Sequence, residues 1–557
     1  MSESPGRVAE KAIPPLIRQI LAHRGMADGD MSDFLYPDYA KGLGDPYAMS
    51  DMGLAVDRLV AARESGETVV VYGDYDIDGI TASGVMIEAL EANGITARSY
   101  IPDRFEEGYG LNIGALEYLA ADGVGLVVTV DCGITSVDEA AWAREHGLDL
   151  IITDHHSVPE VLPEAVAVIN PKRPGDAYAF KDLAGVGVAF KVACALQART
   201  GMPVAGQEKW WLDLVALGTV CDVVPLVGEN RVLAHFGIRV LRQTRRQGVV
   251  ALAQSAGVRV EEIGSYHLGF VLGPRMNATG RLDHAARSLE LVRTGDPRRG
   301  AEIAGELEEL NRQRRVEQTR IFEAAQEMAS LQADSPVMIL ADESWSHGVV
   351  GIVASKLSET FKKPALVGQV LGATIKGSAR SVPGFNMVDA LRANRDLLLK
   401  YGGHYFAAGF TLSAVNLEAF RAGMSRYFME HAETVRGDSE ITVDAGLAGL
   451  AGANLEAVGQ LAMLEPHGSG NPRPLFELSG IEVESAVGVG ATRKHLKFGF
   501  RDQEGRRIGG IGFGLAELYA DMQPGRRVRA LAELNKNEWQ GVVSPQLVVR
   551  ELHDEPV

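Results

Sequence analysis

Cysteine is scarce in this sequence, with three residues, Cys132, Cys194 and Cys221, in a chain of 557. So few thiols exclude a disulfide framework, and because free cysteine is a common small buried residue, we expect no thiol chemistry. Long apolar runs are also lacking, since none approaches the ~20 residues that a membrane-spanning helix needs. The first residues, Met1 to Arg7, include no apolar signal segment. We therefore expect a cytoplasmic protein that does not bind membranes.

Positive charge is in deficit, since 55 lysines and arginines face 73 aspartates and glutamates and the net charge is −18. This balance argues against a protein that coats nucleic acid without specificity, although it leaves room for a local basic groove. One stretch runs against the balance, because residues 231–260 hold six arginines and no acidic residue. The stretch is either a track for phosphate groups or a solvated helix face. Its arginines are Arg231, Arg239, Arg242, Arg245, Arg246 and Arg259.

The length of the chain predicts several domains, because single hydrophobic cores stop growing well below this size. We expect an α/β fold class and five segments. Residues 51–300 and 336–434 alternate apolar strand-like runs with helical patterns, which is typical of α/β domains. Residues 301–335 predict one long linking helix, and short alternating runs over 435–557 predict a β-barrel. Residues 1–50 predict an N-terminal packing segment.

Acidic residues follow the apolar runs of the first α/β segment. The runs Thr68–Tyr72, Leu126–Val130 and Leu150–Thr153 are separated by helical patterns, so they predict right-handed βαβ units and a parallel sheet. Ligands of such sheets bind beyond the carboxyl ends of the strands, where these acids would lie. The acids are Asp74, Asp76 and Asp78 after the first run, Asp131 after the second, Asp154-His155-His156 after the third, and Asp222 after a later helix pattern.

Converging carboxylates repel each other unless cations lie between them. Two divalent cations, Mn²⁺ or Mg²⁺, suit this set better than a closed Zn²⁺ site, because a single imidazole stands among oxygen ligands. We expect Asp131 to bridge ions about 3.5–4 Å apart, an arrangement that hydrolyses phosphoesters or phosphoanhydrides. His156 either donates a hydrogen bond or proton to the phosphate or orients an aspartate. The expected ligands are Asp76, Asp78, Asp131, His155 and Asp222.

Together these motifs resemble the DHH phosphoesterase superfamily and, within it, the bacterial RecJ exonucleases. The first half carries the Asp154-His155-His156 triplet, the Asp74–Gly79 motif and Val130–Gly133. The second half carries Gly377–Ser381 and Gly402–Gly409, which resemble the DHH-associated domain. The resemblance runs through nearly the whole chain. Further stretches that carry it are Ile101–Arg104, Gly108–Gly110, Gly273–Ala278, Gly280-Arg281 and Trp345–Gly351.

The resemblance implies an exonuclease specific for single-stranded DNA, which starts at a 5′ end, releases 5′-mononucleotides and serves recombination and repair. It implies a DHH catalytic domain at 51–300, a DHH-associated domain at 336–434 and an oligonucleotide-binding (OB) fold at 435–557. The implied partners are single-stranded DNA, a single-strand-binding protein and a helicase, and we expect a monomer. His156 joins the five metal ligands as a catalytic residue. The implied substrate-binding residues are Arg104, Arg275, Arg281, Ser378, Arg380 and His404.

Some of these assignments have a separate physical basis, and others have alternatives. Gly377-Ser378 offers backbone N–H groups and Arg380 a bidentate fork, both of which suit a phosphate group. Arg275 and Arg281 either hold phosphates or form ion pairs in the core. The two glycines before His404 either let the backbone approach a ligand or only make a turn.

One position departs from the family pattern. Some members of the superfamily have a histidine ligand four residues before Asp76, where this chain has Tyr72. One metal is therefore expected to bind with fewer protein ligands and more weakly. Asp74 either compensates as a ligand or lies behind the ligands.

The stretch Arg493–Phe500 mixes cations with aromatic residues, which suits contact with a nucleic-acid backbone together with base stacking. The alternative is an ordinary strand, because Phe498 and Phe500 alternate and would face the same side. We expect the cations to bind DNA while the phenylalanines pack the barrel.

Two rival functions differ from a long-strand exonuclease. A DHH-type phosphatase or nuclease of short oligonucleotides or other small phosphoesters needs no barrel and fits about 300–350 residues, so the length argues against it. A catalytically dead DNA-binding scaffold would have lost metal ligands, and all five are present here.

Overall fold

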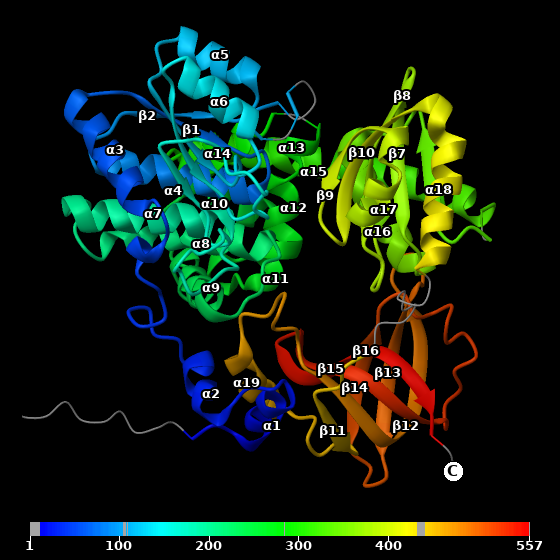
Figure 1. The fold of residues 1–557 in the computed structure, drawn as a ribbon. Helices are drawn as coiled ribbons and strands as arrows, with labels where there is room; N and C mark the ends of the chain where they lie inside the picture. The colour runs from blue at the N-terminus through cyan, green and yellow to red at the C-terminus, as the bar shows by residue number, and fades with distance from the viewer. Residues whose placement is uncertain are drawn as a thin grey trace, which may run out of the picture.

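The computed structural model describes residues 12–103, 107–108, 110–282, 284–332, 334–431 and 441–555, which form two α/β domains and a barrel (Figure 1). The first α/β domain contains a five-stranded sheet of order β2-β1-β3-β4-β5, in which all pairs are parallel. The predicted α/β class with a parallel sheet is confirmed. The strands are β1 (Val69–Gly73), β2 (Ala97–Tyr100), β3 (Leu126–Val130), β4 (Asp149–Thr153) and β5 (Ala167–Ile169).

Helices cover both faces of this sheet. Val69 and Val71 of β1 share a core with α3, α4 and α7, whereas Val70 and Tyr72 share one with α5 and α6. Because β1 and β3 are buried along their whole length, their sequences are continuous apolar runs. The helices are α3 (Met52–Ser65), α4 (Ile77–Ala92), α5 (Ile113–Ala121), α6 (Val137–Glu145), α7 (Gly185–Thr200), α8 (Leu212–Cys221), α9 (Gly228–Leu241), α10 (Gln247–Ser255), α12 (Gly273–Met276), α13 (Thr279–Leu282) and α14 (Ala286–Arg293).

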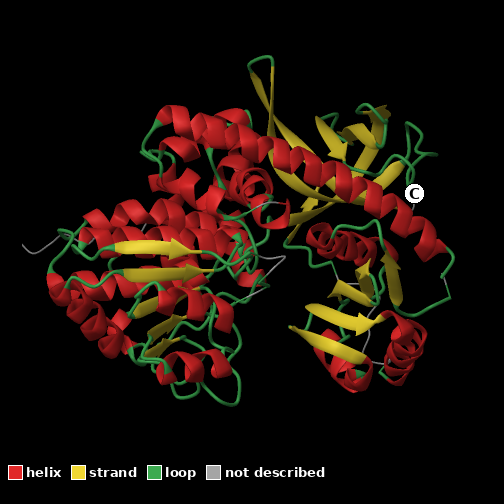
Figure 2. Ribbon diagram, turned by 90° about the horizontal axis from the view of Figure 1, so that it is seen from above, coloured by secondary structure: helices red, strands yellow, loops and turns green. Residues whose placement is uncertain are grey.

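A single long helix, α15 (Pro297–Ser330), connects the two α/β domains. Asp296 caps its N-terminus, because its side chain accepts a hydrogen bond from the backbone N–H of Arg298 (2.9 Å), and proline occupies the first helical position. Its first half packs on α10 and α14, and its second half packs on α16 and β6. Figure 2 shows it running across the molecule from one α/β domain to the other. The predicted connection by a long helix is confirmed.

The second α/β domain contains a five-stranded sheet of order β6-β7-β8-β10-β9. The β6–β7 pair is parallel and the other pairs are antiparallel. Its helix α16 lies between β7 and β8 on one side and α15 on the other. The elements are β6 (Met338–Asp342), α16 (His347–Phe361), β7 (Ala365–Leu371), β8 (Thr374–Arg380), α17 (Met387–Ala393), β9 (Leu398–Gly403), β10 (Ala407–Ser413) and α18 (Leu417–Glu430).

The C-terminal strands form the predicted barrel. Their order is β11-β12-β13-β14-β16-β15, and β12 also pairs with β15, which closes the sheet on itself. Phe498 and Phe500 of β13 are both buried in its core, so these two rings pack the barrel. The strands are β11 (Ala445–Ala448), β12 (Leu475–Val489), β13 (His495–Asp502), β14 (Arg507–Gly512), β15 (Arg527–Trp539) and β16 (Val542–Asp554).

The N-terminal helices α1 (Pro15–His23) and α2 (Asp28–Leu35) belong to the barrel in space, although they precede the first α/β domain in sequence (Figure 1). Ile17, Ile20 and Leu21 share the barrel core with α19 (Leu455–Leu461). The predicted packing segment thus ties the two ends of the chain together.

Arg231 on α9 joins three parts of the molecule. Its guanidinium lies 3.7 Å from the centre of the Phe34 ring and donates hydrogen bonds to the carbonyl oxygens of Phe34 (2.7 Å), Leu464 (3.1 Å) and Glu465 (3.0 Å). Burial lowers the pKa of Arg231 to about 10. A buried cation that is solvated by backbone carbonyls therefore links the first α/β domain to α2 and to the barrel domain.

The arginines of residues 231–260 do not form one continuous surface. Arg231 is buried, and Arg246 pairs with Asp213 (2.9 Å) and Glu88 (2.5 Å) inside the first α/β domain. The proposed phosphate track is therefore broken by two arginines with structural roles.

Among the described helices, none combines the length and apolarity that a bilayer span requires.

Replacing Arg231 with methionine should lower the free energy of unfolding by about 2–4 kcal/mol, because three carbonyl groups at the domain junction lose their donor. Urea denaturation would measure the loss. Arg239→Met, on the exposed side of the same helix α9, is the matched control and should leave the midpoint unchanged. Equal midpoints for the two variants would show that the junction does not depend on Arg231.

Candidate metal centre

The loop after β1 is held by its own side chains and by the residue that follows α12. Asp76 precedes α4, and its Oδ1 accepts hydrogen bonds from the N–H groups of Asp78 (2.8 Å) and Gly79 (3.1 Å). Asn277 Oδ1 accepts a hydrogen bond from the N–H of Ile77 (2.9 Å). A Cβ at Gly79 would lie 2.6 Å from a backbone oxygen of the same loop, so glycine is needed there. The loop therefore presents its carboxylates in a fixed geometry.

Asp78 is fully buried and is held by the start of α7. Its two carboxylate oxygens accept hydrogen bonds from the N–H groups of Gly185 (2.7 Å) and Val186 (2.9 Å), the first residues of that helix. A helix N-terminus favours a negative charge in this position. A Cβ at Gly185 would lie 2.5 Å from Oδ1 of Asp131, so the absence of a side chain allows both carboxylates to approach the helix.

Asp131 lies at the carboxyl end of β3 in an unusual backbone conformation. Its φ is +62°, in the left-handed region that residues other than glycine rarely adopt. Its N–H donates to the carbonyl of Thr153 at the end of β4 (3.0 Å). This bend turns the Asp131 carboxylate toward the triplet that follows β4.

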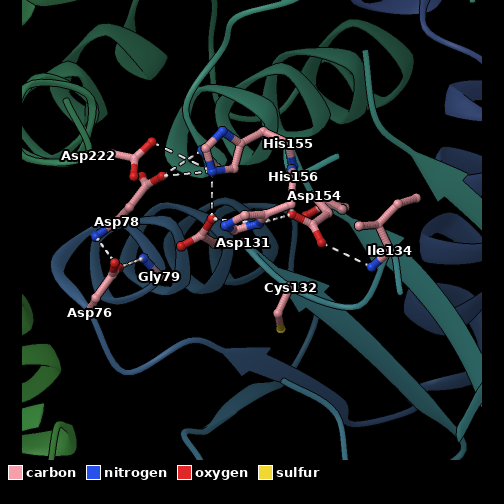
Figure 3. A network of polar contacts seen from close by, with 12 residues as sticks. Asp76, Asp78, Gly79, Asp131, Cys132, Ile134, Asp154, His155, His156 and Asp222 are labelled. Atoms are coloured by element: carbon pink, nitrogen blue, oxygen red, sulfur yellow. Dashed lines mark hydrogen bonds and ion pairs between the residues drawn. The ribbon is translucent and has the colours of Figure 1, made fainter. Parts of the chain in front are cut away.

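His155 lies at the centre of three carboxylates (Figure 3). Its Nε2 is 3.1 Å from Asp131, 3.6 Å from Asp222 and 3.9 Å from Asp78. Three buried atoms, both ring nitrogens of His155 and Oδ1 of Asp131, have no hydrogen-bond partner of good geometry among the described residues. Buried polar atoms of this kind normally have a partner, and a metal ion would supply one.

Three overlapping groups of side chains have ligand atoms within 4.8 Å of one another. Asp131 belongs to two of them, as a carboxylate shared between two ions would. Asp74 joins Asp76 and Asp131 in one group, which favours its role as a compensating ligand. The groups are Asp78, His155 and Asp222; Asp74, Asp76 and Asp131; and Asp131, His155 and His156.

The electrostatics of the cluster also fit divalent cations. Burial, and then the charge of Asp76, raises the pKa of Asp78 to about 7, while burial and Asp78 raise the pKa values of Asp131 and Asp222 well above their usual range. Burial and the neighbouring His156 lower the pKa of His155 to about 3, so its imidazole is neutral and able to bind a metal. Cations among these carboxylates would offset the repulsion that otherwise favours their protonation.

Asp154 is a site residue that sequence reasoning left out of its ligand and catalytic sets. Its Oδ1 accepts from Nδ1 of His156 (2.7 Å) and from the N–H of His155 (2.7 Å), and its Oδ2 accepts from the N–H of Ile134 (3.0 Å). Burial opposes the charge of Asp154, but the hydrogen bond and charge of His156 lower its pKa to about 2. Asp154 thus orients His156, and its place in the triplet was the signal available in the sequence.

The second α/β domain brings His404 to the cluster. Its ring stacks on that of His156, with 6.1 Å between ring centres and 7° between planes. Gly403 has a φ of +142°, and a Cβ there would lie 2.4 Å from the Ala407 carbonyl, so the turn between β9 and β10 requires glycine. The turn and the functional placement of His404 are therefore compatible.

Lys172 was not predicted from the sequence. It is exposed in the loop after β5, where its positive charge offsets part of the rise that burial and Asp78 cause in the pKa of Asp222. Burial, then His156 and Lys172, lower the pKa of His404. A lone lysine in a loop carries no sequence signal for such a position.

Two other predicted substrate-binding residues, Arg275 and Arg281, have partners within the protein. Arg275 pairs with Glu308 (2.6 Å) and donates to the carbonyl of Val271 (2.7 Å). Of the two roles expected for Arg275, the structure thus shows the ion pair. Arg281 donates to the carbonyl of Gly348 (3.0 Å). Arg104 lies outside the described residues.

Ser378 and Arg380 lie next to each other on one face of β8, against α16. A Cβ at Gly351 of that helix would lie 3.2 Å from Oγ of Ser378 and 3.3 Å from Nη2 of Arg380. Arg380 Nε also donates to the Ser355 hydroxyl (3.0 Å). The absence of a side chain at Gly351 therefore lets α16 pack closely against this serine and arginine, and their binding of a phosphate stays a prediction.

Tyr72, which stands where some relatives have a histidine ligand, points to the opposite face of the sheet from α4. Its hydroxyl donates to the carbonyl of Gly110 (3.0 Å) and accepts from the amide of Asn112 (3.2 Å). Cys132 also points away from the carboxylates (Figure 3), and burial raises the pKa of its thiol. Both side chains have structural roles.

Comparisons with known proteins agree with the three domains. Three family models match: "DHH family, N-terminal domain" over residues 68–219, "DHHA1 domain" over 334–430 and "RecJ OB domain" over 443–551. The single-stranded-DNA-specific exonuclease RecJ of Bacillus subtilis is 37% identical over 549 residues, which cover 97% of this chain and 68% of that protein. RecJ of Haemophilus influenzae is 34% identical, with coverage of 91% and 92%.

Solved structures give the same result. The crystal structure of RecJ in complex with Mn²⁺ from Thermus thermophilus has a TM-score of 0.82 at 30% identity and covers 98% of this chain and 76% of its own. The complex of that protein with Mg²⁺ has a TM-score of 0.77 at 28% identity, with coverage of 98% and 75%. Together with the side-chain groups above, these complexes support divalent cations as the cofactor.

Asp131→Asn should raise the melting temperature in EDTA and abolish the rise that Mn²⁺ produces, because it removes both a source of repulsion and a shared ligand. Thermal denaturation with and without Mn²⁺ would show this. Asp138→Asn, in the first turn of α6 outside the cluster, is the control and should keep the Mn²⁺ effect. An unchanged Mn²⁺ effect in Asp131→Asn would contradict the ligand assignment.

Proposed function

The chain belongs to the RecJ family of single-stranded-DNA-specific exonucleases, and we propose that it removes 5′-mononucleotides from the 5′ end of a single strand. The observation that carries this proposal is the cluster of buried carboxylates around His155, with His404 of the second domain facing it. Such a cluster suits metal-dependent hydrolysis of phosphodiesters. We propose that Asp76, Asp78, Asp131, His155 and Asp222 hold two divalent cations, with Asp74 as a further ligand.

The cations, when bound, activate a water molecule and offset the charge that develops on the phosphate. The chain's own residues complete the site. Asp154 fixes Nδ1 of His156, so that the imidazole is oriented to hydrogen-bond a phosphate oxygen. His404 and Lys172 add hydrogen-bonding and positive groups at the same place. Ser378 and Arg380 are proposed to bind the 5′ end and adjacent phosphates.

Selectivity for single strands follows, in this proposal, from the placement of the cluster between two domains that α15 connects. In this proposal a strand at the cluster contacts His156 of the first domain and His404 of the second, and the barrel domain lies below both α/β domains in Figure 1. The exposed lysines Lys497 on β13 and Lys494 just before that strand supply charge for the backbone of the DNA. Hydrolysis of short oligonucleotides alone is less favoured, since it needs no barrel.

The roles in recombination and repair, a single-strand-binding protein and a helicase as partners, a monomeric state and a cytoplasmic location are part of the same proposal. They rest on membership of the family. The geometry of the active cluster does not depend on them.

Single-stranded DNA labelled at its 5′ end should release labelled mononucleotide at once in the presence of Mn²⁺, whereas a 3′ label should stay on long products. Matched duplex should remain intact. Asp131→Asn should reduce the rate by about 10³-fold or more, because a shared metal ligand is lost. Early release of the 3′ label would reverse the polarity, and attack on short oligomers alone would favour the small-substrate phosphatase.

Arg380→Ala should weaken binding of 5′-phosphorylated strands by about tenfold, with little change for strands with a 5′-hydroxyl, because a guanidinium fork contacts the terminal phosphate. Fluorescence anisotropy in EDTA would measure both affinities. Arg392→Ala, exposed on α17 of the same domain, is the control. An equal loss for both kinds of end would indicate a structural role for Arg380.

A further inference from the structure

A cavity of about 150 Å³ lies where the first α/β domain, α15 and α16 meet. Two arginines line it, Arg281 from α13 and Arg314 from α15. Cys221 and Asn277 line it from the side of the candidate metal centre. Cys221 directly precedes Asp222, and Asn277 holds the loop after β1, so the cavity adjoins two of the segments that carry metal ligands.

Arg314 is nine-tenths buried, with 9% of its surface exposed. Its three nitrogens donate to neutral amide oxygens: Nε and Nη2 to Asn311 (3.3 and 3.0 Å) and Nη1 to Gln318 (2.9 Å). Within the described ranges, no ion pair joins Arg314 to a carboxylate. Burial lowers its pKa, and the nearby cations Arg315 and Arg275 lower it further. Its charge thus lies among other positive charges.

The neighbouring turn of α15 shows how such a charge is normally balanced. Arg275 faces Glu308, which neutralises it at 2.6 Å. One turn further along, the residue that faces Arg314 is Asn311, which has no charge to offer. Asn311 is itself fully buried, and its Nδ2 lacks an acceptor among the residues that the structure describes. A buried cation and a buried N–H donor therefore occur together without an anion.

Arg231 provides a contrast within the same molecule. That buried guanidinium is solvated by backbone carbonyls and covered by the Phe34 ring, whereas Arg314 borders a cavity together with a second guanidinium. Leaving a buried charge without an opposite charge is unfavourable unless a ligand supplies it. The size of the cavity suits a tetrahedral oxyanion.

We propose that this cavity binds a phosphate group through Arg314 and Arg281, beside the metal centre. Guanidinium forks match phosphate oxygens in shape and charge. The phosphate is either a free one, carried by inorganic phosphate or a mononucleotide product, or a phosphodiester of a bound strand. Only the second source rests on the proposed function. Either occupant would couple the loops that carry Asp76 and Asp222 to α15.

The first test follows the melting temperature of the metal-free protein in EDTA as inorganic phosphate is added. Saturating phosphate should raise it by about 2 °C or more in the wild type, and Arg314→Gln should lose the rise. Arg312→Gln, exposed on the same helix and paired with Glu309, is the matched control and should keep it. A wild-type rise that persists in Arg314→Gln would overturn the proposal.

Asn311→Asp gives a second test that does not remove the arginine. The new carboxylate would lie against Arg314 and take the place of the phosphate. The variant should melt at a higher temperature than the wild type without phosphate, and it should no longer respond to phosphate. A lower melting temperature with the phosphate response retained would overturn the proposal.

Binding of a single-stranded oligonucleotide in EDTA separates the two sources of phosphate. If a phosphodiester occupies the cavity, Arg314→Gln should weaken binding and reduce the slope of log K against log salt by about 1. If DNA binding and its salt dependence are unchanged while the response to inorganic phosphate is lost, the ligand is free phosphate or a mononucleotide. Neither measurement requires hydrolysis, so failure of the exonuclease assay would leave this result standing.

Discussion

Mutual repulsion between buried carboxylates is the constraint on which the first α/β domain depends. Asp78, Asp131 and Asp222 all approach Nε2 of His155 within 4 Å, and burial removes the water that would weaken their repulsion. The fold opposes this repulsion with backbone N–H groups at the start of α7, which bind Asp78, and with a left-handed bend at Asp131. Divalent cations complete the balance, so metal binding and the local fold are energetically linked.

Arginines in the interior of the protein differ in the groups that surround their guanidinium charge, and three kinds of surroundings occur. Arg246 has carboxylate partners, Arg231 has backbone carbonyls, and Arg314 has only neutral amides beside a cavity. The first two stabilise the domain and its junction with the barrel. The third is left for a ligand. The same side-chain chemistry therefore supports structure or binding, depending on which groups the fold places opposite it.

The two α/β domains act together because α15 fixes their separation. His404 approaches His156 only across that interface, although 248 positions separate the two in the sequence. Arg275 of the first domain pairs with Glu308 on the same helix, and Arg314 of that helix lines the cavity where it meets the first domain. A ligand in the cavity and a substrate at the metal centre would thus contact the same connecting element.

Much of this protein follows from local sequence patterns. The apolar runs ending in Asp76, Asp131 and the Asp154-His155-His156 triplet predict a parallel sheet with acids at one edge, because strand periodicity and the βαβ rule are local properties. The long helix, the barrel and the inward phenylalanines Phe498 and Phe500 follow for the same reason. The family could be predicted as well, since its motifs are contiguous stretches.

Only the tertiary structure decides which charges face one another. Arginine stands in the sequence at positions 231, 246, 275 and 314. Whether such an arginine binds phosphate or forms an ion pair depends on its partner, which can lie far along the chain. Lys172 near the metal centre, Asp154 behind His156 and α1 on the barrel depend on the same long-range packing. The sequence by itself determined the elements and the chemical groups at their ends, and the packing of those elements determined which groups meet, because electrostatic and hydrogen-bonding energies depend on distances that no local pattern encodes.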